Sequence, residues 1–185
     1  MFKWNESFNF EKCIDLSNTK LASPTCVLNE TDLFVSDREL GILRFDIKSG
    51  NLKDKLAMKE FTPNGICLFE SKNLACVNLR TQELNLIDSE NFSKSLKTSK
   101  LAEELQTLHG SYDLVMKKNS CLFIKNHKDS QIFVYDLDLN VKNVFEHNLT
   151  NNLGITLVDS LLVIGKLSEE NESSKSYKIS LFKDF

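Results

Sequence analysis

Short apolar runs separated by short polar turns recur along this chain. The segment LFVSDRELGILRFD, residues 33–46, has an apolar run on each side of a polar turn that contains one glycine. Such short runs, rich in Val, Ile, Leu and Phe and bounded by Asp, Asn, Ser or Gly, are typical of β-strands, because a helix is too long to fit between these turns. The pattern therefore predicts an all-β protein.

The same unit comes back three more times. Equivalent positions in the second strand of each unit are held by Leu33, Leu74, Leu122 and Leu162, with spacings of 41, 48 and 40 residues. An apolar run precedes each of these leucines, another follows it, and a more polar run ends each of the first three units. Repeats of about 40 to 50 residues with four strands are typical of β-propeller blades, whose inner strands are packed on both faces. We therefore expect a β-propeller of about four four-stranded antiparallel blades, in a single domain over residues 1–185.

The longest spacing leaves room for an insertion between the second and third units. In SKLAEELQTLHG, residues 99–110, the leucines at 101, 105 and 108 recur with helical spacing, and Gly110 can end a helix. The sequence predicts one short inserted helix here.

The two ends of the chain leave two architectures open. Trp4 aligns with Phe45, so SFNFEKCIDL, residues 7–16, resembles the outer strand of a unit, whereas the last unit stops after its third strand. The orphan strand at the start either completes the last unit and closes a ring of four blades, or the chain is a fragment of a larger, six-bladed propeller.

Composition and charge narrow the function classes. The chain of 185 residues is 41% hydrophobic and 26% charged, with a formal net charge of −3, which argues against a dominant nucleic-acid footprint. Its apolar runs are far shorter than a bilayer span, and the N-terminus lacks the apolar stretch of a signal peptide, so we expect no membrane partner. Five cysteines without a CxxC pair favour reduced thiols and a cytoplasmic location.

Two segments carry a family resemblance. PNGICLFESKNLACVNLRTQELNLID, residues 63–88, and SPTCVLNETDLFVSDRELGILRFD, residues 23–46, resemble NHL repeats, the first through its Pro-x-Gly-Ile opening and the second through its LFVSD strand. The resemblance implies a β-propeller, usually six-bladed, that forms the protein-binding or RNA-binding end of larger proteins, including ubiquitin ligases. No RING or B-box spacing of Cys and His occurs, so ligase chemistry would lie outside this chain.

One polar position recurs four residues after each anchoring leucine, where the second strand turns into the third. It is held by Asp37, Asn78, Asn126 and Lys166. Two interpretations are open: Asp and Asn bond the backbone of their own turn, or they form a ring that faces a ligand. A calcium site needs six to eight oxygens and usually several carboxylates, which this ring does not supply.

The neighbours of these positions give the candidate binding surface. The same turns carry the basic side chains Arg38, Arg80, His127 and Lys128. Loops on a rigid scaffold are where binding residues concentrate, although basic side chains in such turns are more often simply solvated. We therefore predict that these four residues, with Asp37, Asn78 and Asn126, bind a protein or an acidic peptide.

Other chemistry is scarce. Cys26 and Cys67 are equivalent in the innermost strands and are predicted to be buried free thiols rather than a metal site, and Cys76 and Cys121 are predicted core residues. His109 and His127 have no nucleophile motif beside them, so we assign no catalytic residue, metal or cofactor. Residues 169–176, EENESSKS, are predicted to be a charged loop.

The resulting expectation is a non-enzymatic protein-interaction module. The first alternative is a metal-dependent hydrolase or lactonase of the propeller type, which needs acidic side chains converging at the channel mouth. The second and weaker one is an RNA-binding surface, for which the candidate lysines are Lys94, Lys97, Lys100, Lys117 and Lys118.

Overall fold

The structure confirms an all-β chain made of antiparallel sheets. The computed structural model describes residues 26–28, 31–57, 60–70, 72–92, 95–106, 111–117, 120–128, 130–147, 152–158, 161–171 and 174–182. In these residues the strands form four separate antiparallel sheets, and each sheet contains strands that follow one another directly in the sequence. Each predicted unit is therefore one sheet.

Each of the first three sheets has four strands in chain order. The first sheet contains β1 (Cys26–Leu28), β2 (Asp32–Asp37), β3 (Gly41–Asp46) and β4 (Leu52–Leu56). The second contains β5 (Pro63–Phe69), β6 (Asn73–Asn78), β7 (Glu83–Asp88) and β8 (Ser95–Lys100). The third contains β9 (Tyr112–Lys117), β10 (Cys121–Asn126), β11 (Gln131–Tyr135) and β12 (Val141–Glu146).

The fourth sheet has three strands in the described part of the chain. They are β13 (Asn152–Val158), β14 (Leu161–Asn171) and β15 (Ser174–Phe182), in the order β13-β14-β15. The predicted N-terminal strand, residues 7–16, and Trp4 lie outside the described residues. Across the described residues the four sheets do not close into a ring.

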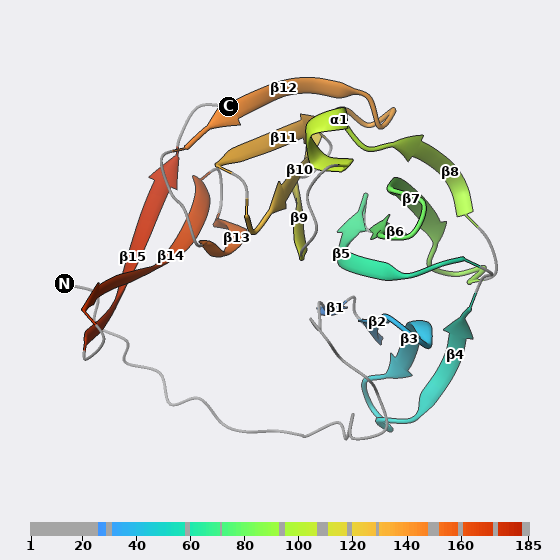
Figure 1. Ribbon diagram of the computed structural model, residues 1–185. Coiled ribbons are helices and arrows are strands. Elements are labelled where there is room, and N and C mark those ends of the chain that lie inside the picture. The colour runs from blue at the N-terminus through green and yellow to red at the C-terminus, as the bar shows by residue number, and fades with distance from the viewer. Residues whose placement is uncertain are drawn as a thin grey trace.

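The sheets follow one another around a common centre (Figure 1). In each sheet the first strand lies innermost, and the later strands lie progressively farther out. The inner strands come close together: a Cβ placed on Gly65 of β5 would lie 2.5 Å from the backbone oxygen of Tyr112 in β9. Gly65 also has φ +69, so glycine is required there by both the contact and the backbone.

Burial is high in the second strand and low in the last strand of each of the first three sheets. Every residue of β2 and β10 is buried, whereas β4, β8 and β12 are mostly exposed. The cause is that a second strand has a sheet packed on each of its faces, while the last strand borders solvent. The predicted gradient from apolar inner strands to a polar outer strand is confirmed.

The core lies between successive sheets rather than inside one of them. Between the first and second sheets, Phe92 lies against Phe34 with ring centroids 5.8 Å apart. Between the third and fourth sheets, Phe123 and Val134 pack with Leu162. Each sheet thus depends on its neighbour for the burial of its apolar face.

The predicted insertion forms a single helical turn. The helix α1 (Glu103–Gln106) is shorter than the predicted span, whose last residues lie outside the described part. Leu101 and Leu105 are buried between the second and third sheets. The Tyr112 hydroxyl donates to the backbone oxygen of Leu105 at 2.7 Å, and the backbone N–H of Ala102 donates to the Tyr135 hydroxyl at 3.0 Å.

The prediction of a loop over residues 169–176 was wrong for most of that segment. β14 and β15 pair through it, with Glu169 opposite Lys175 and Asn171 opposite Ser174. Polarity indicates that a segment is poor at burial, but it does not prevent backbone pairing in a strand that borders solvent. The charged sequence therefore lies in a long hairpin.

Candidate partner-binding face

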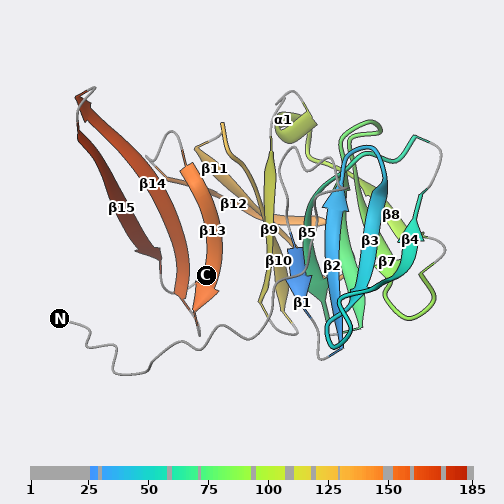
Figure 2. The same cartoon turned by 90° about the horizontal axis from the view of Figure 1, so that it is seen from below.

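The turns that follow the second strands lie at one end of the molecule. Backbone hydrogen bonds tie them to the segments that enter the inner strands: Leu79 N donates to Thr62 O at 2.9 Å, and His127 N donates to Ser111 O at 3.0 Å. In Figure 2, β2 runs toward the upper edge, where α1 also lies. We call this end, with the β2–β3, β6–β7 and β10–β11 turns and α1, the turn face.

The recurring polar residues lie beneath the surface of the turn face. Asp37, Asn78 and Asn126 are at most 5% exposed. Their Oδ1 atoms accept backbone N–H groups of their own turns: Asp37 from Leu40 at 2.7 Å, Asn78 from Arg80 at 3.1 Å, and Asn126 from Lys128 at 2.9 Å. The turn-bonding interpretation thus holds for these three residues, and their part in partner binding stays a prediction. Lys166 lies in β14, and its side chain is outside the described residues.

Two of the four predicted basic residues have acidic neighbours. Arg80 lies 3.5 Å from Glu60, and both side chains are exposed, so the pair is a weak surface contact. His127 Nε2 lies 2.8 Å from Asp113 Oδ2, and a Cβ on Gly154 would approach the same oxygen to 3.2 Å. The Asp113–His127 pair is therefore positioned where the third sheet meets the fourth.

The other two basic residues differ in exposure. Arg38 is partly buried, and its Nε is a buried donor without a hydrogen-bond partner in the described structure. Lys128, in the β10–β11 turn, is exposed. These two side chains are not neutralised by an acidic side chain in any contact of the described residues.

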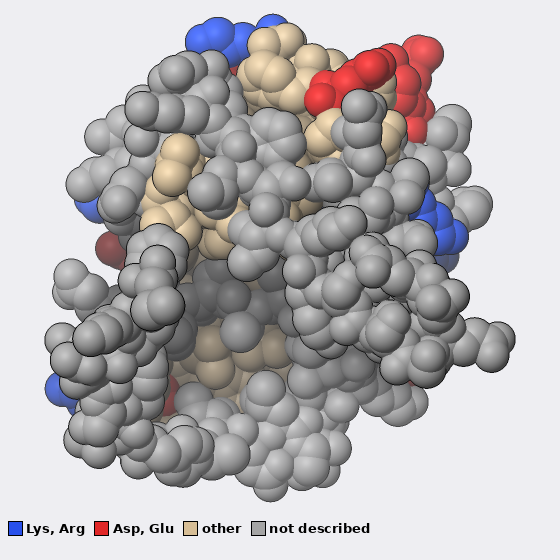
Figure 3. All heavy atoms as spheres, turned by 90° about the vertical axis from the view of Figure 1, so that its left-hand side faces the viewer, with Lys and Arg blue, Asp and Glu red and all other residues tan. Residues whose placement is uncertain are grey.

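The sequence analysis did not identify the acidic residues that lie on the same face as the four basic turn residues. Glu60 precedes the second sheet, Asp113 lies within an apolar strand, and α1 exposes Glu103 and Glu104. In Figure 3, the largest group of described acidic side chains lies at the upper right corner, whereas Lys and Arg lie at separate points around the edge. The turn face thus carries charges of both signs instead of the basic surface that the turns alone indicated.

Of the lysines proposed for RNA binding, the three that the structure describes lie on two different sheets. Lys97 is paired with Asp138 at 3.0 Å and Lys100 with Glu83 at 2.8 Å, both on the outer strand β8. Lys117 ends the innermost strand β9, on the third sheet. Lys94 and Lys118 lie outside the described residues.

The predicted core cysteines are buried free thiols. Cys67, Cys76 and Cys121 are all buried and unbonded to one another. Burial raises the pKa of the Cys67 thiol, and it raises that of Cys76 to about 12. The prediction is thus confirmed for Cys67, while the side chain of Cys26 and the residue His109 lie outside what the structure describes.

Metal-binding and membrane-spanning features were sought in the same residues. The described residues contain no group of three or more His, Cys, Asp or Glu side chains arranged to hold a metal ion. Nor do they contain a helix with the length and apolar character needed to cross a membrane.

We compared the chain with known protein families, sequences and structures. No family model and no curated protein sequence matches this chain. Among solved structures, the computationally designed protein Ika4 matches with a TM-score of 0.61 at 11% identity, over 93% of this chain and 98% of that one. The designed protein Ika8 matches with a TM-score of 0.53 at 12% identity, over 76% of this chain and 42% of that one.

Two natural proteins give similar matches. Hydrazine synthase of Kuenenia stuttgartiensis has a TM-score of 0.60 at 11% identity, over 80% of this chain and 42% of that one. Glutaminyl cyclase of Myxococcus xanthus has a TM-score of 0.59 at 9% identity, over 75% and 59%. The chain thus spans less than two thirds of both proteins. Together these likenesses define a propeller-like fold.

Proposed function

We propose that this chain is an NHL-like β-propeller that acts as a non-enzymatic protein-interaction module in the cytoplasm, as the partner-binding part of a larger protein. The observation that carries the proposal is the turn face, where successive sheets each present a short turn with charged side chains. Sheets packed on each other hold such turns in fixed positions, and a fixed set of loops is a common form of binding site.

The charges on this face specify the kind of partner. Arg38 and Lys128 are cationic and have no acidic neighbour in the described contacts. Arg80 forms only a weak, exposed ion pair with Glu60. Exposed Glu103 and Glu104 stand on α1 nearby. The face therefore suits a protein segment with acidic groups opposite the turns and a basic group opposite α1.

Ring closure is a separate part of the proposal. Of the two architectures that the sequence leaves open, the closed ring of four sheets is the one that makes a testable claim about the N-terminal segment. In a closed ring, residues 7–16 would be needed as the fourth strand of the last sheet, as the repeat alignment predicts. Deletion of residues 2–16 is then expected to lower the midpoint of thermal unfolding, whereas an unchanged midpoint would argue for the fragment.

The partner-binding proposal is tested by a charge-matched pair of variants. Partners are captured on the wild-type chain, identified by mass spectrometry and then measured with purified components. Arg38→Ala with Arg80→Ala is expected to weaken binding at least about tenfold, because Arg side chains often dominate interfaces. The control, Lys55→Ala with Lys72→Ala, removes two exposed charges elsewhere and is expected to bind like wild type.

Folding of both variants is checked by thermal unfolding. Surface substitutions usually change stability by only about 0.5 kcal/mol, and the buried Nε of Arg38 has no hydrogen-bond partner in the described structure, so both midpoints should stay near that of wild type. Equal affinity of the two double variants for a purified partner would rule out the turn face.

A further inference from the structure

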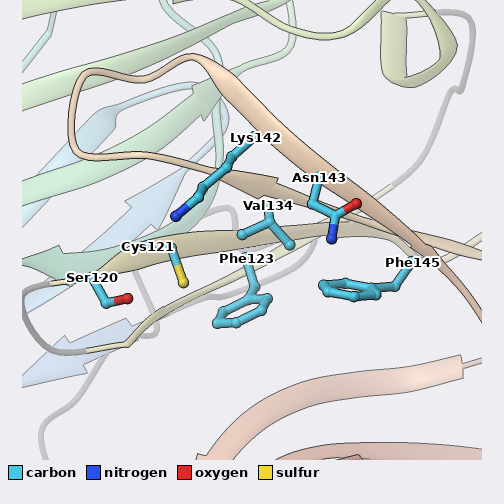
Figure 4. Close-up of a pocket in the computed structure, with 7 residues that line it drawn as sticks. All are labelled: Ser120, Cys121, Phe123, Val134, Lys142, Asn143 and Phe145. Atoms are coloured by element: carbon cyan, nitrogen blue, oxygen red, sulfur yellow. The ribbon is translucent and has the colours of Figure 1, made fainter. Parts of the chain in front are cut away.

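A cleft opens on the outer half of the third sheet, away from the turn face. It has a volume of about 150 Å³ and is lined by Ser120, Cys121, Phe123, Val134, Lys142, Asn143 and Phe145. Figure 4 shows these side chains on one side of the sheet, from β10, β11, β12 and, for Ser120, the turn that precedes β10. Phe123, Val134 and Phe145 belong to the cluster that packs toward the fourth sheet, so the cleft lies at the junction of the two sheets.

The floor of the cleft is apolar and its rim carries one cation. Phe123 is fully buried and Val134 is 5% exposed, whereas Lys142 is exposed on β12. In Figure 4, the Lys142 side chain extends over the floor toward Cys121 instead of pointing away from the cleft. A ligand in the cleft would therefore meet apolar walls and one ammonium group.

Comparison of the repeats shows that, among the described residues, Lys142 lacks the acidic neighbour of the equivalent lysine in the first sheet. Lys142 is the bulged residue of β12, since Val134 pairs with Asn143 and Tyr135 with Val141. Lys53 is the bulged residue of β4 in the first sheet, and its Nζ lies 2.8 Å from Asp32.

In the third sheet the residue equivalent to Asp32 is Cys121, just before the anchoring leucine. None of the ion pairs within the described residues involves Lys142.

We propose that this cleft binds a small aromatic carboxylate from solution. A cleft of about 150 Å³ with Phe123, Val134 and Phe145 on its floor is large enough for one benzene ring. The ring would lie on Phe123 and Phe145, and the carboxylate would take the place that Asp32 holds beside the equivalent lysine. The cleft is separate from the turn face, so this inference does not depend on the proposed partner.

The C-terminal residues of the chain also carry an aromatic ring and a carboxylate that could occupy the cleft. Asp184 and Phe185 follow β15 in the sequence and carry a carboxylate and an aromatic ring. The experiment therefore includes the variant Phe185→Ala, which removes that ring and leaves the cleft residues unchanged.

The test is a titration of the ¹⁵N-labelled full chain with phenylacetate, followed by NMR. We expect saturable shifts confined to the backbone amides around Phe123, Val134 and residues 142–145, in wild type and Phe185→Ala alike. Phenylacetamide, which has the ring without the charge, should bind about three- to fivefold more weakly. Lys142→Gln should weaken phenylacetate binding by the same factor, and the matched control Lys55→Gln should not.

The same titration can also contradict the proposed carboxylate site. Saturable binding that is seen only in Phe185→Ala would assign the cleft to the chain's own aromatic ring and overturn a ligand from solution. Weak shifts spread over the whole surface, or equal binding of phenylacetate and phenylacetamide, would overturn the carboxylate site. Because Lys142 is exposed, its substitution leaves the core unchanged, and the amide spectrum itself reports whether the variant is folded.

Discussion

The first and third sheets share one backbone plan but bury opposite charges. The first sheet buries the carboxylate of Asp32, which lies 2.7 Å from Arg44 and 2.8 Å from Lys53. Burial alone would raise the pKa of Asp32, but hydrogen bonds from Arg44, Lys53 and Thr31 hold it well below its ordinary value. In the third sheet, Cys121 and Val134 stand at the positions of Asp32 and Arg44.

The third sheet instead buries two basic side chains. Lys125 is fully buried, and its Nζ donates to the backbone oxygen of Asn126 at 2.9 Å. His147, after β12, is 4% exposed, and burial together with the positive charge of Lys125 lowers its pKa to about 4. The repeat thus determines where the strands lie, while the charged and polar side chains buried in each sheet differ.

The largest expected effect concerns the buried acid. Asp32→Ala leaves Arg44 and Lys53 without their shared partner, and the expected loss of unfolding free energy is about 3 kcal/mol. At the equivalent position, Cys121→Ala removes only a small apolar group and is expected to cost about 1 kcal/mol. Urea unfolding of both variants measures the difference, and equal losses would contradict the contrast between the two sheets.

The buried histidine predicts a pH effect that belongs to the third sheet. As pH falls below the ordinary value of 6.5, the unfolded chain binds a proton at His147 that the folded chain accepts only when the pH approaches its lowered pKa of about 4. Stability should therefore fall as pH decreases through this window, by at most about 1.4 kcal/mol per pH unit.

In His147→Gln this fraction of the pH dependence should disappear. Urea titrations of both proteins at several pH values measure it, and parallel curves would show that His147 titrates normally.

A second pH window belongs to the first sheet. Because the pKa of folded Asp32 lies below its ordinary value of 3.8, its stabilising effect is complete above that pH and is lost as pH falls further. Asp32→Asn should therefore be less stable than wild type at neutral pH, and the gap should narrow in acid. A gap that stays constant down to about pH 2 would mean that the ion pairs with Arg44 and Lys53 do not form.

The sequence predicted the sheets well and the charged contacts poorly, for a physical reason. Strand order follows from local periodicity, so the runs anchored at Leu33, Leu74 and Leu122 could be recognised one at a time. The pairing of Arg80 with Glu60, or of His127 with Asp113, depends on loops and strands that meet only in the folded chain. The turn residues were therefore identified correctly by position, but the charge of their surroundings was not.

The reactivity of the cysteines tests the packing of the second and third sheets, with a smaller expected effect. Cys76 is fully buried with a pKa of about 12, and Cys67 is buried in the same sheet, so both should react slowly with a thiol reagent in mildly alkaline buffer. Cys121 lines the cleft and is expected to be labelled before them. Mass spectrometry of the labelled peptides gives the order, and labelling of Cys76 first would contradict the second sheet's packing.

The most direct test of the repeated-sheet architecture is hydrogen–deuterium exchange along the whole chain. Buried second strands should exchange slowly and exposed outer strands quickly, because local opening is easiest at an edge with few buried contacts. We predict slow exchange in β2, β6 and β10 and fast exchange in β4, β8 and β12, recurring with the spacing of the repeat. Protection that is uniform, or that does not recur with the repeat, would contradict the radial arrangement of the sheets.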